Sequence, residues 1–128
     1  MTDAAFVAFG RHVIVDISEA PHDVLDNGER LLASLVHAAE NEGVTVLGTL
    51  QHQFHPSGVT VLLLLAESHV SLHTYPTQGR AFFDAFTCGT GHEPLNIFRA
   101  FAERTLHGRY KVVQQERGWL EQVEAAHA

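Results

Sequence analysis

The sequence predicts an α+β fold in which an antiparallel β-sheet carries two main helices on one face, as a two-layer sandwich. Two observations support this prediction. Two stretches have apolar residues at three- and four-residue spacing, and six others are short and rich in β-branched or aromatic residues. Their order is strand, helix, several strands, helix, strand, which is typical of an antiparallel sheet.

Two helices are predicted, over residues 21–41 and 94–107. In each stretch the apolar side chains share one face, which predicts burial of that face against the sheet. Gly43 and Gly108 follow the two stretches, where glycine commonly ends a helix. Pro94 stands at a favourable first helical position because its missing N–H would have no intrahelical partner there.

Strands are predicted over residues 11–17, 44–54, 59–66, 69–75, 80–87 and 110–116. The residues of 76–79 favour a turn, which predicts a hairpin between the fourth and fifth strands, and Pro56-Ser57-Gly58 predicts another turn. One sheet face would carry Val70, Leu72 and Phe83, or their alternates, away from the helices. A second copy of the chain would then have to cover that face, so we expect a dimer that forms through the sheet.

Composition predicts one soluble globular domain spanning residues 1–128, with 45% hydrophobic and 18% charged residues. A net charge of −7 and the absence of a Lys/Arg-rich run disfavour nucleic-acid binding. The longest apolar run, residues 59–66, is too short to cross a membrane. The N-terminal residues lack the features of a secretory signal, and Cys88 is the only cysteine. We therefore expect a cytoplasmic protein.

Ten histidines raise the question of a metal site. His52 with His55, or His69 with His73, are the pairs to consider, and His69 and His73 share one face of a predicted strand. No CxxC or HExxH spacing accompanies either pair, and Cys88 is distant in the sequence. Ordinary surface or hydrogen-bonded histidines are therefore favoured, and we predict no metal.

Three residues could carry nucleophilic or acid–base chemistry. Ser68 lies at the break between two predicted strands, His73 follows in a strand expected to return near it, and Cys88 ends the strand after the hairpin. Gly89 then leaves the backbone open to close approach. Taken alone, these residues are better explained as a turn serine, a packed histidine and a buried thiol.

Several blocks of the sequence resemble the prokaryotic S-adenosylmethionine decarboxylases. The run LAESHVSLHT at residues 65–74 resembles their processing site, and AFTCG at residues 85–89 resembles a downstream block. Three further runs are similar to the family: GRH at 10–12, HQFHPSGV at 52–59 and ERG at 116–118. The blocks keep the family's order and spacing from about residue 10 to residue 118.

The resemblance implies self-cleavage between Glu67 and Ser68 by attack of the serine hydroxyl on the preceding carbonyl. Ser68 would become a covalent pyruvoyl group, which forms a Schiff base with the substrate amine and withdraws electrons during decarboxylation. By the same resemblance, His73 would remove the α-proton during processing, with Thr60 as the supporting hydroxyl. Cys88 would return a proton to the substrate carbon.

The resemblance also implies a homodimer of processed protomers with shared active sites, acting in polyamine biosynthesis on S-adenosylmethionine to give the aminopropyl donor. Tyr75 and a partner's Phe54 would stack on adenine. Thr77 replaces the family's ribose-binding glutamate and cannot offer two carboxylate oxygens, although Asp84 could substitute. L-ornithine or L-arginine is therefore an alternative substrate, and an unprocessed, non-catalytic homologue is a remote alternative.

Overall fold

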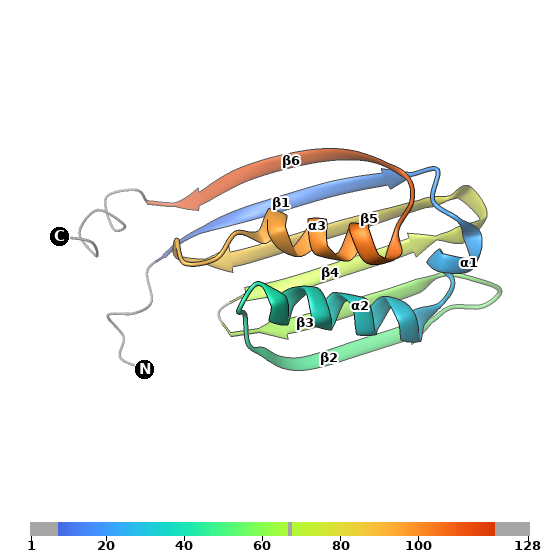
Figure 1. Ribbon diagram of the computed structural model, residues 1–128, viewed down its shortest axis with the longest axis horizontal. Coiled ribbons are helices and arrows are strands. Elements are labelled where there is room, and N and C mark those ends of the chain that lie inside the picture. Colours follow the sequence, from blue (N-terminus) through green and yellow to red (C-terminus); the bar gives the residue numbers. More distant parts are fainter. Residues whose placement is uncertain (1–7, 67, 120–128) are drawn as a thin grey trace.

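The computed structural model describes residues 8–66 and 68–119 and shows a six-stranded antiparallel sheet with the helices on one side (Figure 1). This confirms the predicted α+β class. The strands are β1 (Phe9–Ser18), β2 (Val46–Gln53), β3 (Val59–Leu65), β4 (Ser68–Tyr75), β5 (Arg80–Cys88) and β6 (Arg109–Gly118). The helices are α1 (His22–Leu25), α2 (Gly28–Asn41) and α3 (Pro94–Thr105).

The strand order in the sheet is β2-β3-β4-β5-β1-β6. The middle strands β3, β4 and β5 follow one another as hairpins, and residues 76–79 form the predicted turn between β4 and β5. The first strand is inserted between β5 and the last strand, with Val13 opposite Ala85 on one side and Gln114 on the other. The first and last strands therefore lie side by side in one sheet.

The single helix predicted over residues 21–41 is wrong, because the chain breaks after α1 and starts again as α2. Asp26 lies in the break, and its carboxylate accepts the Gly58 N–H at 2.9 Å and the Gln53 side-chain N–H at 2.8 Å. Asn27 then caps α2, since its side chain accepts the Arg30 N–H. The polar residues at the break thus stabilise a turn against helix continuation. Among the described residues, no helix has the length and apolarity to cross a bilayer.

The core lies between the sheet and the two long helices. Side chains alternate along each strand, so that Val70, Leu72 and Phe83 all point to the helices and are almost fully buried. Phe83 contacts the rings of Phe98 and Phe101 from α3. The alternates of these strand residues therefore lie on the opposite side of the sheet, which we call the open face.

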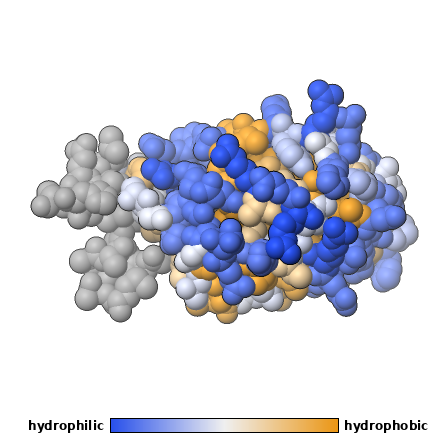
Figure 2. All heavy atoms as spheres, in the orientation of Figure 1, coloured by the Kyte–Doolittle hydropathy of each residue, from blue (hydrophilic) through white to orange (hydrophobic). Residues whose placement is uncertain are grey.

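Figure 2 looks onto the helix-covered side, where hydrophilic side chains dominate the surface. The open face differs, because none of the described helices covers it and large apolar side chains remain exposed there. Its exposed apolar residues come from five strands: Ile14, Leu50, Leu62, Leu64, Phe82 and Val113. An apolar surface distributed over five strands is typical of a contact with another protein surface.

We predict that Thr74→Val destabilises the protein by about 2–3 kcal/mol, because it leaves two buried backbone groups without partners. The Thr74 hydroxyl accepts the Val59 N–H at 2.9 Å and donates to the Leu25 carbonyl at 2.7 Å. Urea unfolding in a Ser68→Ala background, which lacks the hydroxyl expected to cleave the chain, measures the change. Thr49→Val, on exposed β2, is the control and should change stability by less than about 0.5 kcal/mol. Equal effects of the two variants would contradict the assignment.

Candidate active site

Ser68 is the first residue of β4, and its hydroxyl lies between two backbone segments. Its Oγ donates to the Ala66 carbonyl at 3.4 Å and accepts the Cys88 backbone N–H at 3.3 Å. Leu65 and Ser68 are paired across β3 and β4, so only two residues connect these strands. Glu67, the other residue of the predicted cleavage site, lies outside the described residues.

Cys88 is the last residue of β5 and is half-buried. Gly89 follows with a φ of +76°, a left-handed conformation that favours glycine, and its N–H donates to the Phe9 carbonyl at 2.7 Å. Gly10 lies opposite Cys88, where a Cβ would come within 2.6 Å of the Phe86 ring and the Thr87 carbonyl. Glycines on both strands thus allow the chain to turn closely around the thiol-bearing residue.

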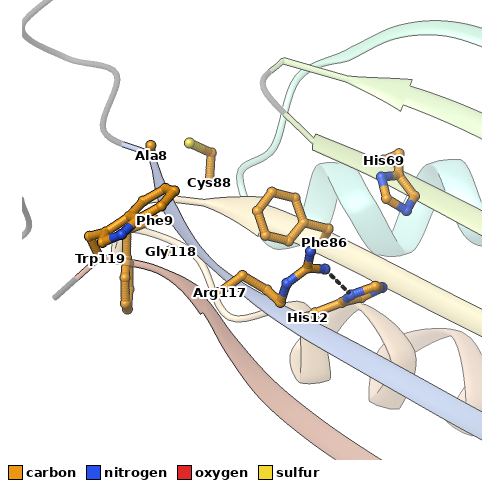
Figure 3. Close-up of a pocket in the computed structure, with 9 residues that line it drawn as sticks. All are labelled: Ala8, Phe9, His12, His69, Phe86, Cys88, Arg117, Gly118 and Trp119. Atoms are coloured by element: carbon orange, nitrogen blue, oxygen red, sulfur yellow. Dashed lines mark hydrogen bonds between the residues drawn. The ribbon is translucent and has the colours of Figure 1, made fainter.

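A cavity of about 650 Å³ adjoins Cys88 at this end of the sheet (Figure 3). Phe86 lies between Cys88 and the imidazoles of His12 and His69 in this view. Arg117 extends from β6 toward His12. The cavity is therefore lined by a thiol, aromatic rings, two imidazoles and a guanidinium group.

Asp84 joins three neighbouring strands beside this cavity. Its Oδ2 accepts a hydrogen bond from His12 on β1 at 2.6 Å and from His69 on β4 at 3.1 Å, and its Oδ1 accepts one from Ser71. Arg117 donates to His12 Nδ1 at 3.3 Å. Because arginine can only donate, the proton of a neutral His12 is on Nε2, the atom that faces Asp84.

These contacts shift two pKa values in opposite directions. Burial disfavours the charged form of Asp84, but hydrogen bonds from His69, Ser71 and His12 outweigh it and hold the pKa of the carboxyl well below its usual range. The hydrogen bond to Asp84 raises the pKa of His69, against an opposing effect of burial. At neutral pH the site therefore holds an ionised carboxylate whose oxygens accept three hydrogen bonds.

The sequence did not reveal this cluster of His12, His69, Ser71 and Asp84. Alternation placed His69 and Ser71 on one face, yet nothing in the sequence placed β1 beside β5. The ligand atoms of His12, His69 and Asp84 lie within 4.8 Å of one another, close enough to hold a cation. The proton on His12 Nε2 instead fits a hydrogen-bond network, since a metal would require that nitrogen unprotonated. The absence of a metal stays a prediction.

The expectation that the strand of His73 returns near Ser68 is wrong. β4 runs straight, so the five-residue separation corresponds to roughly 17 Å along the strand. His73 faces the open side, where its Nδ1 lies 3.0 Å from Thr60 Oγ1 on β3. The structure thus brings Ser68 together with Cys88, and His73 together with Thr60, at two different ends of the sheet.

The two predicted adenine-stacking residues lie at the His73 end. Phe54 follows β2 and contacts His52, while Tyr75 ends β4 and contacts Phe82 with ring centroids 5.4 Å apart. Both rings are about half exposed. Thr77 lies nearby in the exposed turn after Tyr75. The oxygens of Asp84 accept hydrogen bonds from His12, His69 and Ser71, and its role as a replacement for the missing glutamate stays a prediction.

The profile of the S-adenosylmethionine decarboxylase family matches residues 11–118. An S-adenosylmethionine decarboxylase proenzyme of Thermosipho africanus is 34% identical over 91% of this chain and 89% of its own length. S-adenosylmethionine decarboxylase proenzyme 2 of Bacillus anthracis is 47% identical over 70% of this chain and 72% of its own.

A solved structure has the same architecture. The adenosylmethionine decarboxylase of Aquifex aeolicus superposes with a TM-score of 0.79 at 28% identity, over 88% of this chain and 92% of that one. Sequence similarity and structural similarity therefore both relate this chain to S-adenosylmethionine decarboxylases. The chain belongs to the S-adenosylmethionine decarboxylase family and is an enzyme of the carboxy-lyase class.

Proposed function

We propose that this chain is a self-processing decarboxylase of S-adenosylmethionine that supplies the aminopropyl donor of polyamine biosynthesis in the cytoplasm. One observation supports the proposal most directly. The hydroxyl of Ser68 lies at a two-residue strand connection, bonded to the N–H of Cys88, and Cys88 lines the adjoining cavity. The predicted nucleophile and the predicted proton donor are thus adjacent in one chain of this family.

The residues present fit a pyruvoyl group derived from Ser68. In the cleavage, Ser68 Oγ would attack the Glu67 carbonyl and displace the Ser68 nitrogen, so that an ester replaces the peptide bond. Elimination would then break the Ser68 Cβ–Oγ bond and leave this oxygen on the new Glu67 carboxylate. The resulting dehydroalanine would tautomerise to an imine, and hydrolysis of the imine by water would release ammonia and leave a chain beginning with pyruvoyl at position 68. The Cys88 N–H already contacts Ser68 Oγ and would orient the hydroxyl for this attack.

When present, the pyruvoyl group supplies a carbonyl that accepts the electron pair left by loss of carbon dioxide. Cys88 would then return a proton to the substrate carbon from the cavity wall. The ring of Phe86, two residues before Cys88 on the same strand face, presents apolar surface to the cavity and limits the access of water.

We also propose that two copies of the chain share their active sites through the open face. His73 lies roughly 17 Å along β4 from Ser68, so it cannot serve Ser68 of its own chain. Two open faces related by a two-fold axis would bring the His73 end of one copy to the Ser68 end of the other. The exposed apolar residues of this face support such a contact.

The comparisons favour S-adenosylmethionine as the substrate, since the relatives are named for that activity. They give no support to L-ornithine or L-arginine. Only Thr77, where the family carries a ribose-binding glutamate, favours these alternatives, because neither amino acid has a ribose to bind. Phe54 and Tyr75 remain exposed and can stack on an adenine ring.

We predict that purified wild-type protein yields two fragments, residues 1–67 and a pyruvoyl-capped 68–128, by intact-mass analysis. Ser68→Ala should give one uncleaved chain, and Ser18→Ala, at the end of β1 away from Cys88, should cleave normally. Cys88→Ala should cleave but lose turnover by about 100-fold or more, because it lacks the proton donor. Persistence of a single wild-type chain after long incubation would contradict self-processing.

Disruption of the open face should separate the copies. We predict that Leu64→Glu, which places a charge among exposed apolar residues, converts a dimer to a monomer in light scattering and slows self-cleavage. Val112→Glu is the matched control, since Val112 is similarly exposed but faces the helix side of β6. A wild-type protein that is monomeric and still cleaves would exclude the shared site.

Carbon dioxide release should be measured in parallel from S-adenosylmethionine, L-ornithine and L-arginine. We predict release from S-adenosylmethionine alone. Thr77→Glu should lower KM for this substrate by about tenfold, because it restores an acceptor for the ribose hydroxyls, whereas Thr49→Glu on β2 should not. Carbon dioxide release from L-ornithine alone, or from L-arginine alone, would contradict the proposed substrate and identify that amino acid as the substrate instead.

A further inference from the structure

Self-cleavage at Ser68 would change how the start of β4 is held. Before cleavage, the Ser68 hydroxyl bonds to the Ala66 carbonyl and the Cys88 N–H, and the chain continues into β3. The proposed processing removes this oxygen from residue 68 and cuts the connection. The reactive group would then stand at a chain end, and chain ends are the parts of a strand that most readily fray.

Two side chains next to this end reach the same carboxylate. His69 Nε2 lies 3.1 Å from Asp84 Oδ2, and the Ser71 hydroxyl donates to Asp84 Oδ1. Asp84 itself lies on β5, whose other neighbour is β1. These bonds use atoms that processing leaves unchanged, so they persist after cleavage.

We propose that Asp84 is a positioning residue that holds the first residues of β4, and with them the pyruvoyl end of the processed chain, against β5 through His69 and Ser71. This inference rests on the proposed function, because a new chain end exists only if Ser68 is processed. We do not assign Asp84 a contact with the reacting atoms. It acts through the side chains of His69 and Ser71, which follow the reactive group by one and three residues.

The carboxylate is in turn oriented from the opposite side. His12 Nε2 donates to Asp84 at 2.6 Å, and Arg117 on β6 fixes the His12 tautomer by donating to Nδ1. Four strands thus contribute to the arrangement, from β4 through β5 and β1 to β6. A carboxylate held by several donors in a partly buried place rotates little, and hydrogen bonds to a charged group are among the stronger ones.

The contact between His69 and Asp84 has a defined pH range. The pKa of His69 is raised, so the stabilisation by the imidazolium is complete below the ordinary histidine value and is lost as pH rises through the folded value. The pKa of Asp84 is lowered, so its contribution is lost only in acid. The groups facing His69 are Asp84 and Phe86 from β5, His12 from β1 and Leu64 from β3, and the Cys88 thiol and the Arg117 guanidinium line the same cavity.

The test uses Asp84→Asn, with Asp16→Asn as the matched control. Asp16 lies on the same sheet face, opposite Phe82, and is exposed. We expect processed Asp84→Asn to show hydrogen exchange about tenfold faster at the amides of residues 69–72. Its kcat should fall about tenfold with little change in KM, and the alkaline limb of the wild-type pH profile should move to lower pH. Self-cleavage should stay within about threefold of wild type, and Asp16→Asn should behave as wild type throughout.

Histidine NMR on the uncleaved Ser68→Ala protein provides a readout that needs no activity. Its His69 resonance should titrate above the ordinary histidine range and return toward it in Ser68→Ala/Asp84→Asn. If Asp84→Asn does not fold, His69→Leu removes the same contact, because leucine has no hydrogen-bond donor, and leaves the bonds of Asp84 to His12 and Ser71.

A wild-type protein that neither cleaves nor decarboxylates would contradict the proposed function. The NMR titration would still test the His69–Asp84 contact in that case. An active wild type whose Asp84→Asn variant shows unchanged exchange and pH profile would overturn the positioning role. Loss of cleavage in a folded Asp84→Asn variant would also overturn it, because the role assigned to Asp84 begins after the cut. Stoichiometric binding of a metal ion by the wild type would also overturn the proposal, because His12, His69 and Asp84 would then form a metal site and not a hydrogen-bond network.

Discussion

The alternation of side chains across one antiparallel sheet is the constraint on which the rest of this molecule depends. Helices α2 and α3 cover one face of the central strands, so every second residue of those strands is committed to the core. The remaining residues must share an open face that is partly apolar and partly charged. Core stability and active-site chemistry therefore use the same strands, on opposite sides.

A partly buried charged cluster centred on Asp84 lies on the open face. Asp84 carries a negative charge among apolar neighbours such as Ile14 and Phe82, a placement that costs free energy unless hydrogen bonds compensate. His12, His69 and Ser71 supply that compensation from the strands on either side. An apolar surface with a fully bonded polar centre can be covered by a second protein without leaving an unpaired charge.

Much of the fold was predictable, because helical and strand periodicities are local properties. All six strands and the α3 helix were expected close to their observed bounds. The break between α1 and α2 was not, since it depends on Asp26 accepting hydrogen bonds from residues 53 and 58. The motifs singled out Ser68 and Cys88, but neither their contact nor the separation of His73 from Ser68 followed from the sequence. The Asp84 cluster required the insertion of β1, which brings together residues 72 positions apart.

The strand order has a consequence for a chain cut at residue 68. The N-terminal piece would contain β1, β2 and β3, and the C-terminal piece β4, β5 and β6, but the sheet does not divide into those halves. Instead β1 lies between β5 and β6, while β3 pairs with β4. The strands of the two polypeptides would be interleaved in the sheet. The polypeptides could separate only if the three pairings β3–β4, β1–β5 and β1–β6 all broke. A chain cut at this position would therefore remain one subunit made of two polypeptides.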